Sequence, residues 1–453
     1  MTGAARGHEQ DGASRWTIGV RGAGWRASVD AAGAVRARDA SARWAVLAED
    51  GWHDPATRPP SLRQRRVLGA PVVETRVKVP GGDVACTAWA APDRGGVVVL
   101  EWRNESPRAV AVAIAADGAP LVAARAASAA AAEGLGWAAS TWALPHASAL
   151  RAVLHVGGTG GVTGDGATGA AHEAWVVGLA DVDRVVGAWR EVAHGAGRVD
   201  LPDPRAAEAL VAARCDLVLD DAPASAVDDP ADALLVAAEA LRLREPARAE
   251  PWELAAWCGA VAERVGRRTR GSTGGPARRE SRALVMGAWA LAAAGERDGA
   301  ADVAAIAGRL GDPVDGLVDG HGAAHAPTRP SDAAGPDAAG PVAVRAARAI
   351  AVIEDGLARV AADGSVQVLP DGIPDAWRGG HFEAHGLVAG PGRTISYAVR
   401  WHGAAPALLW EVVGDPRGLA VAAPRVDPRF AAHEARGETL LRELDGAAAA
   451  PRP

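Results

Sequence analysis

The chain has 453 residues and a formal net charge of −7, with 48 Lys and Arg against 55 Asp and Glu. Arg is interspersed with the acidic residues and no basic stripe stands out, so we expect no nucleic-acid partner. No apolar run approaches the roughly 18 residues of a membrane span, and the polar start of the chain lacks the apolar core of a signal peptide.

The cysteines point to a reducing compartment. Cys86, Cys215 and Cys258 are odd in number and far apart in the sequence. This spacing fits neither a disulfide framework nor a zinc site, and it indicates buried free thiols. We therefore expect a cytoplasmic protein without a metal or other cofactor. The length allows several domains of about 100–200 residues each, and the sequence leaves the oligomeric state open.

The first part of the chain has the two-residue period of β-strands. Residues 1–14 show no period and are expected to be disordered. Alternating segments then recur, separated by Gly, Pro, Asp and Asn, at 16–21, 25–30, 73–79, 84–90, 97–103 and 109–115. Short half-buried strands at this spacing predict an antiparallel β-sandwich, which we assign to 15–199. The apolar run at 174–179 is expected to be its last strand.

Near residue 200 the apolar period lengthens to that of a helix. Three helix starts are predicted where an acid precedes a proline: Asp203-Pro204, Asp229-Pro230 and Glu250-Pro251. The acid can cap the first free N–H groups, and proline suits the first helical position. Further helices are expected at about 282–295, 297–310 and 343–361. Short connections predict antiparallel hairpins over 200–361, with a long loop at 312–341.

After residue 361 the two-residue period returns. Strands are expected at 365–369, 381–387, 394–401, 407–413 and 419–422. They predict a small β-domain over 362–430, followed by a tail at 431–453. The whole chain is thus expected to be an α+β multidomain protein with an N-terminal antiparallel β-sandwich, a central α-hairpin domain and a small C-terminal β-domain.

One C-terminal stretch carries a more specific pattern: a Leu-Pro start, a second proline, a Trp, a Gly-Leu pair and a strand ending in Trp. In this sequence the pattern reads Leu369-Pro370-Asp371-Gly372-Ile373-Pro374-Asp375-Ala376-Trp377, then Gly386-Leu387, then Ser396-Tyr397-Ala398-Val399-Arg400-Trp401-His402-Gly403. This stretch resembles the closing segment of glycosidases with a six-hairpin (α/α) toroid. Those enzymes also have the order β-sandwich, hairpins and β-domain.

The helical region departs from that family. A complete ring of six hairpins, with helices of about 11–12 residues, needs about 200 residues or more. Residues 200–361 are fewer than this and must also hold the predicted loops at 267–281 and 312–341. The resemblance therefore implies a partial α/α toroid. No segment matches the family's general-acid motif, so no catalytic residue is transferred. The leading hypothesis is a glycosidase-like protein that does not hydrolyse its carbohydrate ligand. An active glycoside hydrolase or related sugar-processing enzyme and a helical interaction scaffold remain alternatives.

The candidate ligand site lies on the C-terminal strands. Glu383 and His385 are two residues apart on one predicted strand and so share a face. Arg400, His402 and Glu411 lie on or beside neighbouring strands. We expect these five side chains to form a polar cluster at the interface with the helices, suited to hydrogen-bonding sugar hydroxyls or to proton transfer. A solvated strand face is the simpler interpretation.

Other residues could serve a sugar, but nothing in the sequence selects them. Hydrolysis needs two facing carboxyl groups, and the acids of the helical region are Glu208, Asp216, Asp220, Asp221, Asp228, Asp232, Glu239, Glu253 and Glu280. Helix caps and solvated faces explain these positions equally well. Five tryptophan side chains could stack on sugar rings: Trp137, Trp142, Trp252, Trp257 and Trp289. Packing in a core is the competing interpretation for each Trp.

Overall fold

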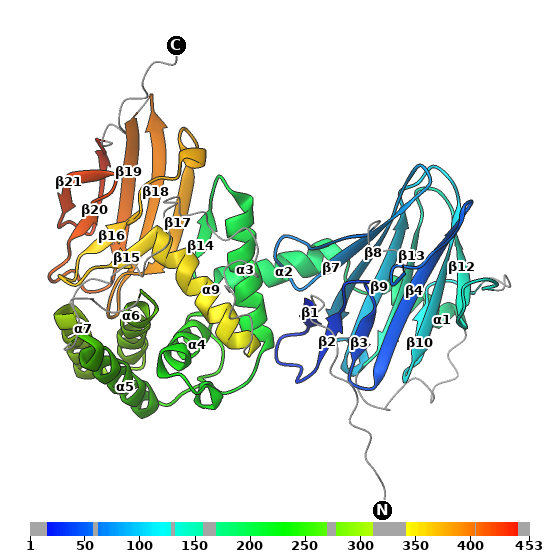
Figure 1. Ribbon diagram of the computed structural model, residues 1–453, viewed down its shortest axis with the longest axis horizontal. Helices are drawn as coiled ribbons and strands as arrows, with labels where there is room; N and C mark the ends of the chain where they lie inside the picture. Colours follow the sequence, from blue (N-terminus) through cyan, green and yellow to red (C-terminus); the bar gives the residue numbers. More distant parts are fainter. Residues whose placement is uncertain are drawn as a thin grey trace, which may run out of the picture. The chain divides into compact units, whose positions relative to one another are not determined.

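The computed structural model describes residues 16–57, 62–127, 132–156, 169–269, 278–310, 341–403 and 405–442. The expected disorder at 1–14 and most of the expected loop at 312–341 lie outside these residues. The chain is an α+β multidomain protein, as predicted, with antiparallel sheets, then helices, then further sheets (Figure 1). It divides into the units 1–188 and 189–453. Among the described residues, no helix has the length and apolar character needed to cross a membrane.

The strands of the first unit pack as a β-sandwich. They are β1 Trp16–Gly19, β2 Arg26–Val29, β3 Val35–Ala37, β4 Ala40–Ala48, β5 Gly51–His53, β6 Leu62–Arg66, β7 Val73–Val79, β8 Gly82–Ala91, β9 Val97–Asn104, β10 Val110–Asp117, β11 Leu121–Ala123, β12 Ser140–Leu144 and β13 Ala149–His155. One sheet has the order β1-β2-β3-β4-β10-β12, with β5 on β4, and the facing sheet has the order β11-β13-β9-β8-β7-β6. The ladders are antiparallel, as the predicted sandwich requires.

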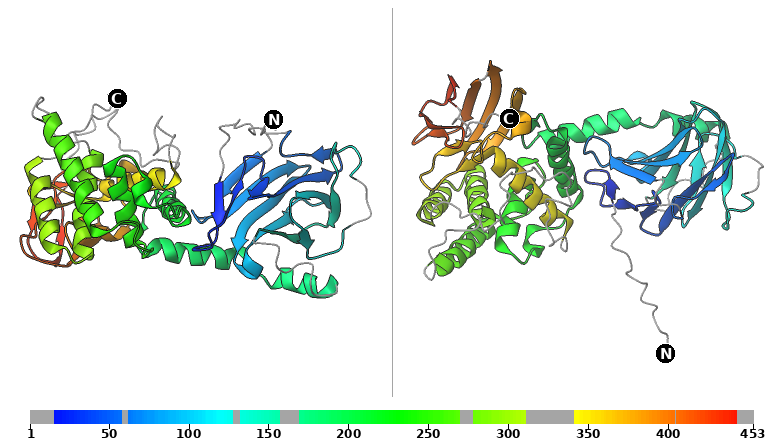
Figure 2. Two further views of the ribbon diagram at one scale, coloured as in Figure 1. Left: turned by 90° about the horizontal axis from the view of Figure 1, so that it is seen from below. Right: turned by 45° about the horizontal axis from the view of Figure 1, so that its top comes forward.

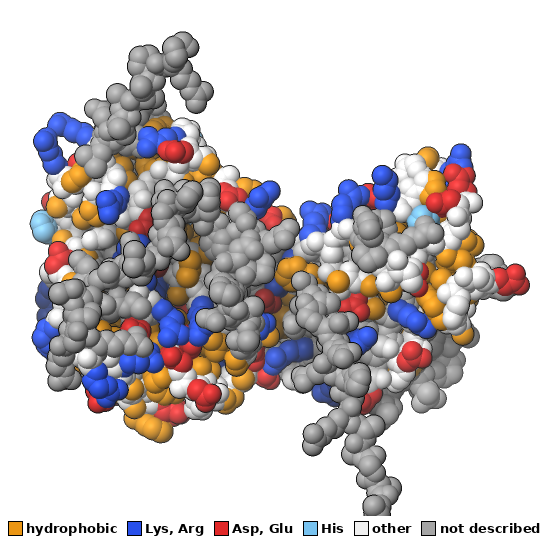
Figure 3. Space-filling view, viewed as in Figure 1, with side chains coloured by type: hydrophobic (Ala, Val, Ile, Leu, Met, Phe, Trp, Pro, Cys, Tyr) orange, Lys and Arg blue, Asp and Glu red, His pale blue; other side chains and the backbone are white. Residues whose placement is uncertain are grey.

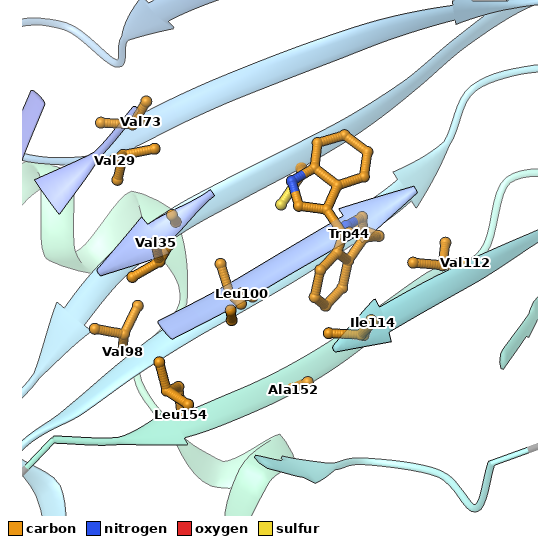
Figure 4. Packing of buried hydrophobic residues seen from close by; sticks show 14 of the residues in the cluster. Val29, Val35, Trp44, Val73, Val98, Leu100, Val112, Ile114, Ala152 and Leu154 are labelled. Carbon is orange, nitrogen blue, oxygen red and sulfur yellow. The ribbon is translucent and has the colours of Figure 1, made fainter. Parts of the chain in front are cut away.

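The sandwich core follows directly from the two-residue period. Val112 and Ile114 of β10 are buried inward beside Trp44 of β4. From the facing sheet, Trp102 of β9 meets Trp44 edge to face, with ring centroids 6.3 Å apart. Figure 4 shows the side chains of both sheets filling this layer. Edge-to-face aromatic pairs add to the stability that apolar burial provides.

The strand expected at 174–179 is instead part of a helix, α1 (Gly169–Gly178). This helix packs against β11 and β13. Val176 and Leu179 are buried, and Arg151 of β13 donates a hydrogen bond to the Leu179 carbonyl oxygen at 3.2 Å. A short apolar run fits either a strand or a helix, and here the outer face of β13 selects the helix. The boundary between the two units falls within the next helix, α2 (Val182–His194).

The predicted helices lie in the second unit, after the end of α2. They are α3 Pro204–Leu219, α4 Pro230–Arg242, α5 Pro251–Thr269, α6 Arg278–Ala293, α7 Arg297–Leu310 and α9 Val342–Leu357. Two of the predicted caps are confirmed: Asp203 Oδ1 accepts a hydrogen bond from the Arg205 N–H at 3.0 Å, and Asp229 Oδ1 accepts one from the Ala231 N–H at 2.8 Å. At the third start, the Glu250 N–H donates to Glu253 Oε2.

The helices pack on one another in a filled layer. Helix α6 contacts α4, α5, α7 and α9, and α9 also packs along α3 and α4. Figure 2 shows α4 to α7 side by side. At the α5–α6 contact, a Cβ atom added to Gly287 would lie 2.5 Å from the Cys258 Sγ, so the two backbones approach closely because residue 287 has no side chain.

The last strands form two sheets in the described residues. They are β14 Arg198–Asp200, β15 Ala358–Val360, β16 Val366–Val368, β17 Phe382–Val388, β18 Thr394–His402, β19 Ala405–Val413, β20 Val421–Ala423, β21 Asp427–Ala432 and β22 Arg436–Leu440. We call the order β14-β17-β18-β19-β22 the β18 sheet, and β15-β16-β20-β21 the β16 sheet. Thus 431–440, expected as part of a tail, is largely strand, because β22 pairs with β19.

One face of the β18 sheet belongs to the core. Ile395, Tyr397 and Val399 are buried on this inner face together with Ala206 of α3 and Leu357 of α9. The Tyr397 hydroxyl donates a hydrogen bond to the Leu357 carbonyl oxygen at 3.0 Å. The inner face therefore attaches the sheet to the helices.

Candidate functional site

The structure brings together three of the predicted site residues. His385 Nε2 lies 3.1 Å from Glu383 Oε2 on β17, and Arg400 Nη2 of β18 lies 3.7 Å from Glu383 Oε1. The side chains of Glu383, His385 and Arg400 are 41%, 45% and 57% exposed. They form an open cluster with a carboxylate at its centre.

This cluster lies on the outer face of the β18 sheet, not at the expected interface with the helices. The alternation of β17 explains the difference. Phe382 and Ala384 point to the core, so Glu383 and His385, which lie between and beside them, point to solvent. The simpler interpretation, a solvated strand face, describes their environment.

The other two predicted residues lie farther along the same sheet. Glu411 of β19 stands opposite Ser396 of β18 and Arg436 of β22. His402 is at the end of β18, opposite Ala405, and its side chain is exposed. The register therefore separates Glu411 and His402 from the Glu383 cluster instead of converging all five side chains on one point.

The helical layer contains a fully buried Arg–Glu centre. Glu354 of α9 accepts hydrogen bonds from Arg214 Nη2 at 2.6 Å, from Arg282 Nη2 at 2.6 Å, and from Arg242 Nη1 at 2.7 and 2.9 Å. Arg242 also donates to Glu239 Oε1 at 2.7 Å. All five residues are buried, and the side chains of Arg242 and Glu354 are 3% and 0% exposed. The carboxylate of Glu354 thus joins α3, α4, α6 and α9.

Arg214 and Arg242 also donate hydrogen bonds to backbone carbonyl oxygens. Arg214 Nη2 donates to the Ala196 carbonyl oxygen at 3.2 Å, and Arg242 Nη2 donates to the Gly386 carbonyl oxygen at 3.2 Å. Gly386 lies at the register shift of β17, and its positive φ of 71° favours glycine. The centre therefore fixes the link before β14 and the irregular part of β17 to the helices.

The electrostatics of the centre follow from its geometry. Burial alone would raise the pKa of Glu354, but Arg242, Arg214 and Arg282 outweigh it and lower this pKa to about 2. Burial disfavours the charged form of a side chain. It therefore raises the pKa of Glu239, although Arg242 acts in the opposite direction, and it lowers the pKa of Arg214. Glu354 is therefore the permanent anion of the set.

Sequence reasoning missed this centre: Glu239 was among the acids that caps or solvated faces explain, and Glu354 was not among the candidate acids. One signal was present: the Glu354-Asp355 pair directly follows the apolar run Ala349-Ile350-Ala351-Val352-Ile353. A charged pair that continues an apolar helical stripe is placed toward the core, where it requires cationic partners. The partners, on three other helices, become visible only in the fold.

Comparison with known proteins does not assign the chain to a family. No protein-family model matches it, and no curated protein sequence matches it.

A second set of ion pairs surrounds the start of α4. Asp232, 3% exposed, accepts hydrogen bonds from Arg348 Nη2 at 2.6 Å and from Arg279 Nη1 at 3.1 Å. The N-cap residue Asp229 pairs with Arg264 Nη1 at 3.0 Å. Burial opposes ionisation of Asp229, but the Arg264 hydrogen bond lowers its pKa. The acids of this part of the layer are thus neutralised by arginine rather than exposed to a ligand.

Two further groups of sequence candidates can be placed. Trp142 is buried, whereas Trp252 of α5 is 70% exposed. The other three Trp side chains, those of Trp137, Trp257 and Trp289, are partly buried. Within the described ranges, no group of three or more His, Cys, Asp or Glu side chains could hold a metal ion.

Proposed function

We propose that the chain is a glycosidase-like protein that binds carbohydrate without hydrolysing it. The observation that carries this proposal is the state of Glu354. Glycoside hydrolysis uses two carboxyl groups facing one sugar, of which one donates a proton. Glu354 is fully buried and contacts three guanidinium groups, so it has neither a proton to give nor access to a sugar. Its neighbour Glu239 is also buried and shares Arg242.

The Glu383 cluster supports the carbohydrate part of the proposal. A carboxylate, an imidazole and a guanidinium on one open face provide planar donors and acceptors for neighbouring hydroxyl groups. The resemblance of the closing segment to sugar-processing enzymes points to the same class of ligand. The ligand would then contact Glu383, His385 and Arg400, and reach toward Glu411 and His402 along the sheet.

A glycan array followed by calorimetry tests this proposal. We expect at least one oligosaccharide to bind the full chain, and Glu383→Gln with His385→Ala to weaken its binding about tenfold or more. Glu438→Gln, a change of an exposed acid on β22 of the same sheet, serves as the matched control. Incubation of the bound oligosaccharide with the protein should release no reducing sugar. Binding with release would favour the active glycoside hydrolase instead, and an array without any hit would reject carbohydrate binding.

The alternative of a helical interaction scaffold is favoured by one observation. The large apolar side chain of Trp252 is 70% exposed on α5, and Ala255, Ala256 and Gly259 are exposed one and two turns away. An apolar helix face of this kind is typical of a protein-binding surface. A partner captured by the wild-type chain but lost with Trp252→Ser, in the absence of any glycan hit, would favour the scaffold.

The cysteines support a reducing compartment such as the cytoplasm. Cys86, Cys215 and Cys258 are buried thiols that form no disulfide. Figure 3 shows both basic and acidic side chains on the visible face of each unit. Fractionation of the source cell, with antibody detection of the full chain, tests the compartment.

A further inference from the structure

One edge of the β18 sheet is open. Strand β22 pairs with β19 on one side, and no described strand pairs with its other side. Beside this ladder, the Val412 N–H donates a hydrogen bond to the Ala435 carbonyl oxygen at 2.6 Å. In an antiparallel pair, residues bonded to the neighbouring strand alternate with residues whose backbone groups point away. Counting from Ala435, the N–H and C=O groups of Arg436, Glu438 and Leu440 therefore point to the open edge, which can pair with a further strand.

The side chains at this edge carry opposite charges. Arg436 and Glu438 are two residues apart and share the outer face of the sheet, and both are exposed. Arg436 stands opposite Glu411 of β19, but among the described residues neither Arg436 nor Glu438 forms an ion pair. Leu440, on the same face, is 58% exposed. The edge therefore presents a cation, an anion and an apolar side chain that this chain leaves uncovered.

A second copy of the chain fits this edge in one register. When two β22 strands pair antiparallel about a twofold axis at Gly437, Arg436 of each chain lies opposite Glu438 of the partner subunit. Both residues then direct their backbone N–H and C=O groups toward each other, as a hydrogen-bonded pair requires.

The charges disfavour the neighbouring registers. An axis at Arg436 would place two arginines directly opposite each other, and an axis at Glu438 would do the same with two glutamates. Opposite charges in directly opposed positions stabilise a sheet, whereas like charges destabilise it. The alternation of charge along β22 therefore favours the register centred on Gly437.

We propose that the chain forms a twofold-symmetric dimer through β22, in which two β18 sheets join into one continuous sheet. A twofold interface uses the same patch on both copies, and the β22 edge is complementary to itself in both hydrogen bonding and charge. Because the strand is short, the interface is small, and we expect a Kd of about 10–100 μM. The dimer does not rest on carbohydrate binding, since Glu383, His385 and Arg400 lie on β17 and β18, away from this edge.

Sedimentation equilibrium of the full chain at about 1–200 μM tests the dimer. Arg436→Glu and Glu438→Arg should each weaken dimerisation about tenfold or more, because each places like charges opposite each other at two positions. The combined variant, Arg436→Glu with Glu438→Arg, should restore the wild-type Kd to within about threefold. Arg205→Glu makes the same change of charge at an exposed arginine in the first turn of α3 and should leave the Kd unchanged.

Cysteine pairing tests the register independently of charge. In a hydrogen-bonded antiparallel pair the opposed Cα atoms lie about 5.5 Å apart, which suits a disulfide. A mixture of Arg436→Cys and Glu438→Cys chains should therefore give a disulfide-linked heterodimer under mild oxidation. Either variant alone should give about tenfold less linked dimer, because its new cysteine faces an unchanged residue. The natural cysteines Cys86, Cys215 and Cys258 are buried and should not compete.

Each of four results would overturn the proposal. The first is a wild-type chain that remains monomeric at about 200 μM. The second is a dimer that neither single charge reversal weakens, and the third is one that Arg205→Glu weakens as much as Arg436→Glu does. The fourth is a combined variant that keeps the native circular dichroism spectrum and stays monomeric, together with a cysteine mixture that does not cross-link.

Discussion

Arg242 of α4 and Glu354 of α9 form a two-point ion pair in the middle of the helical layer. Nη1 of Arg242 lies 2.9 and 2.7 Å from the two carboxylate oxygens of Glu354, and the side chains are 3% and 0% exposed. Such a pair is strongly destabilised when one partner is removed, because the other is left as an uncompensated buried charge. The pair therefore gives the sharpest test of the structure.

Glu354→Gln should lower the free energy of unfolding by about 3–5 kcal/mol. The reason is that Arg214, Arg242 and Arg282 lose their common anion while they remain buried. Denaturant unfolding followed by circular dichroism gives this value. Glu383→Gln, which alters an exposed ion pair, should change the stability by about 0.5 kcal/mol or less. Similar losses from both substitutions would contradict the buried centre.

The stability should also depend on pH through Glu354. Its pKa is lowered from the ordinary value of 4.5 to about 2 in the folded protein, because three guanidinium groups surround the carboxylate. A lowered folded pKa gives stability that is fully present above about pH 5 and is lost as the pH falls toward 2. The stability difference between the wild type and Glu354→Gln should therefore shrink over this window, by about 1.4 kcal/mol per pH unit at most. A difference that stays constant from pH 6 to pH 3 would show that Glu354 is not held ionised.

Gly287→Ala should destabilise the α5–α6 contact by about 1–3 kcal/mol. The new Cβ would meet the Cys258 Sγ at 2.5 Å and a Leu234 methyl group at 3.1 Å. Combining it with Cys258→Ala should recover part of the loss, and a double-mutant cycle measures this coupling. Gly259→Ala is the matched control. No atom lies within 4 Å of its added Cβ, so the better helix propensity should stabilise α5 by about 0.5–1 kcal/mol.

Truncation of a buried Trp and of an exposed Trp should change the stability by very different amounts. Trp102→Ala removes a fully buried side chain from the sandwich and should lower the unfolding free energy of the first unit by about 3–5 kcal/mol. Trp252→Ala removes an exposed side chain and should change stability by about 0.5 kcal/mol or less. Thermal unfolding of the two variants beside the wild type makes the comparison. A large loss from Trp252→Ala would mean that its side chain is covered by a partner copy in solution.

The thiols should be unreactive while the protein is folded. The three cysteines are buried, and burial raises the pKa of Cys258 to about 12, so little thiolate is present at neutral pH. A colorimetric thiol reagent should react with less than one thiol per folded chain and with all three after denaturation. Rapid reaction of the folded chain with two or three equivalents would disprove this burial.

The amino-acid sequence alone determined the order of the β-rich, helical and second β-rich regions along the chain. The two-residue period of 73–79, the acid–proline starts at Asp203 and Asp229, and the clean alternation of 394–401 each depend on local stereochemistry. These signals are therefore readable without knowledge of the fold. The two-residue spacing of Glu383 and His385 likewise determined that they share one face of a strand.

The tertiary structure decided what those elements meet. The run at 174–179 became a helix because the outer face of β13 was available to cover, and Arg436–Leu440 became a strand because β19 had a free edge. Which arginines surround Glu354 depends on contacts between residues 72 to 140 positions apart. Which face of β17 is solvated depends on the packing of Phe382 and Ala384 in a core that also contains Ala206 of α3. Local periodicity carries no information about such pairings, since they arise only when the helices and sheets pack.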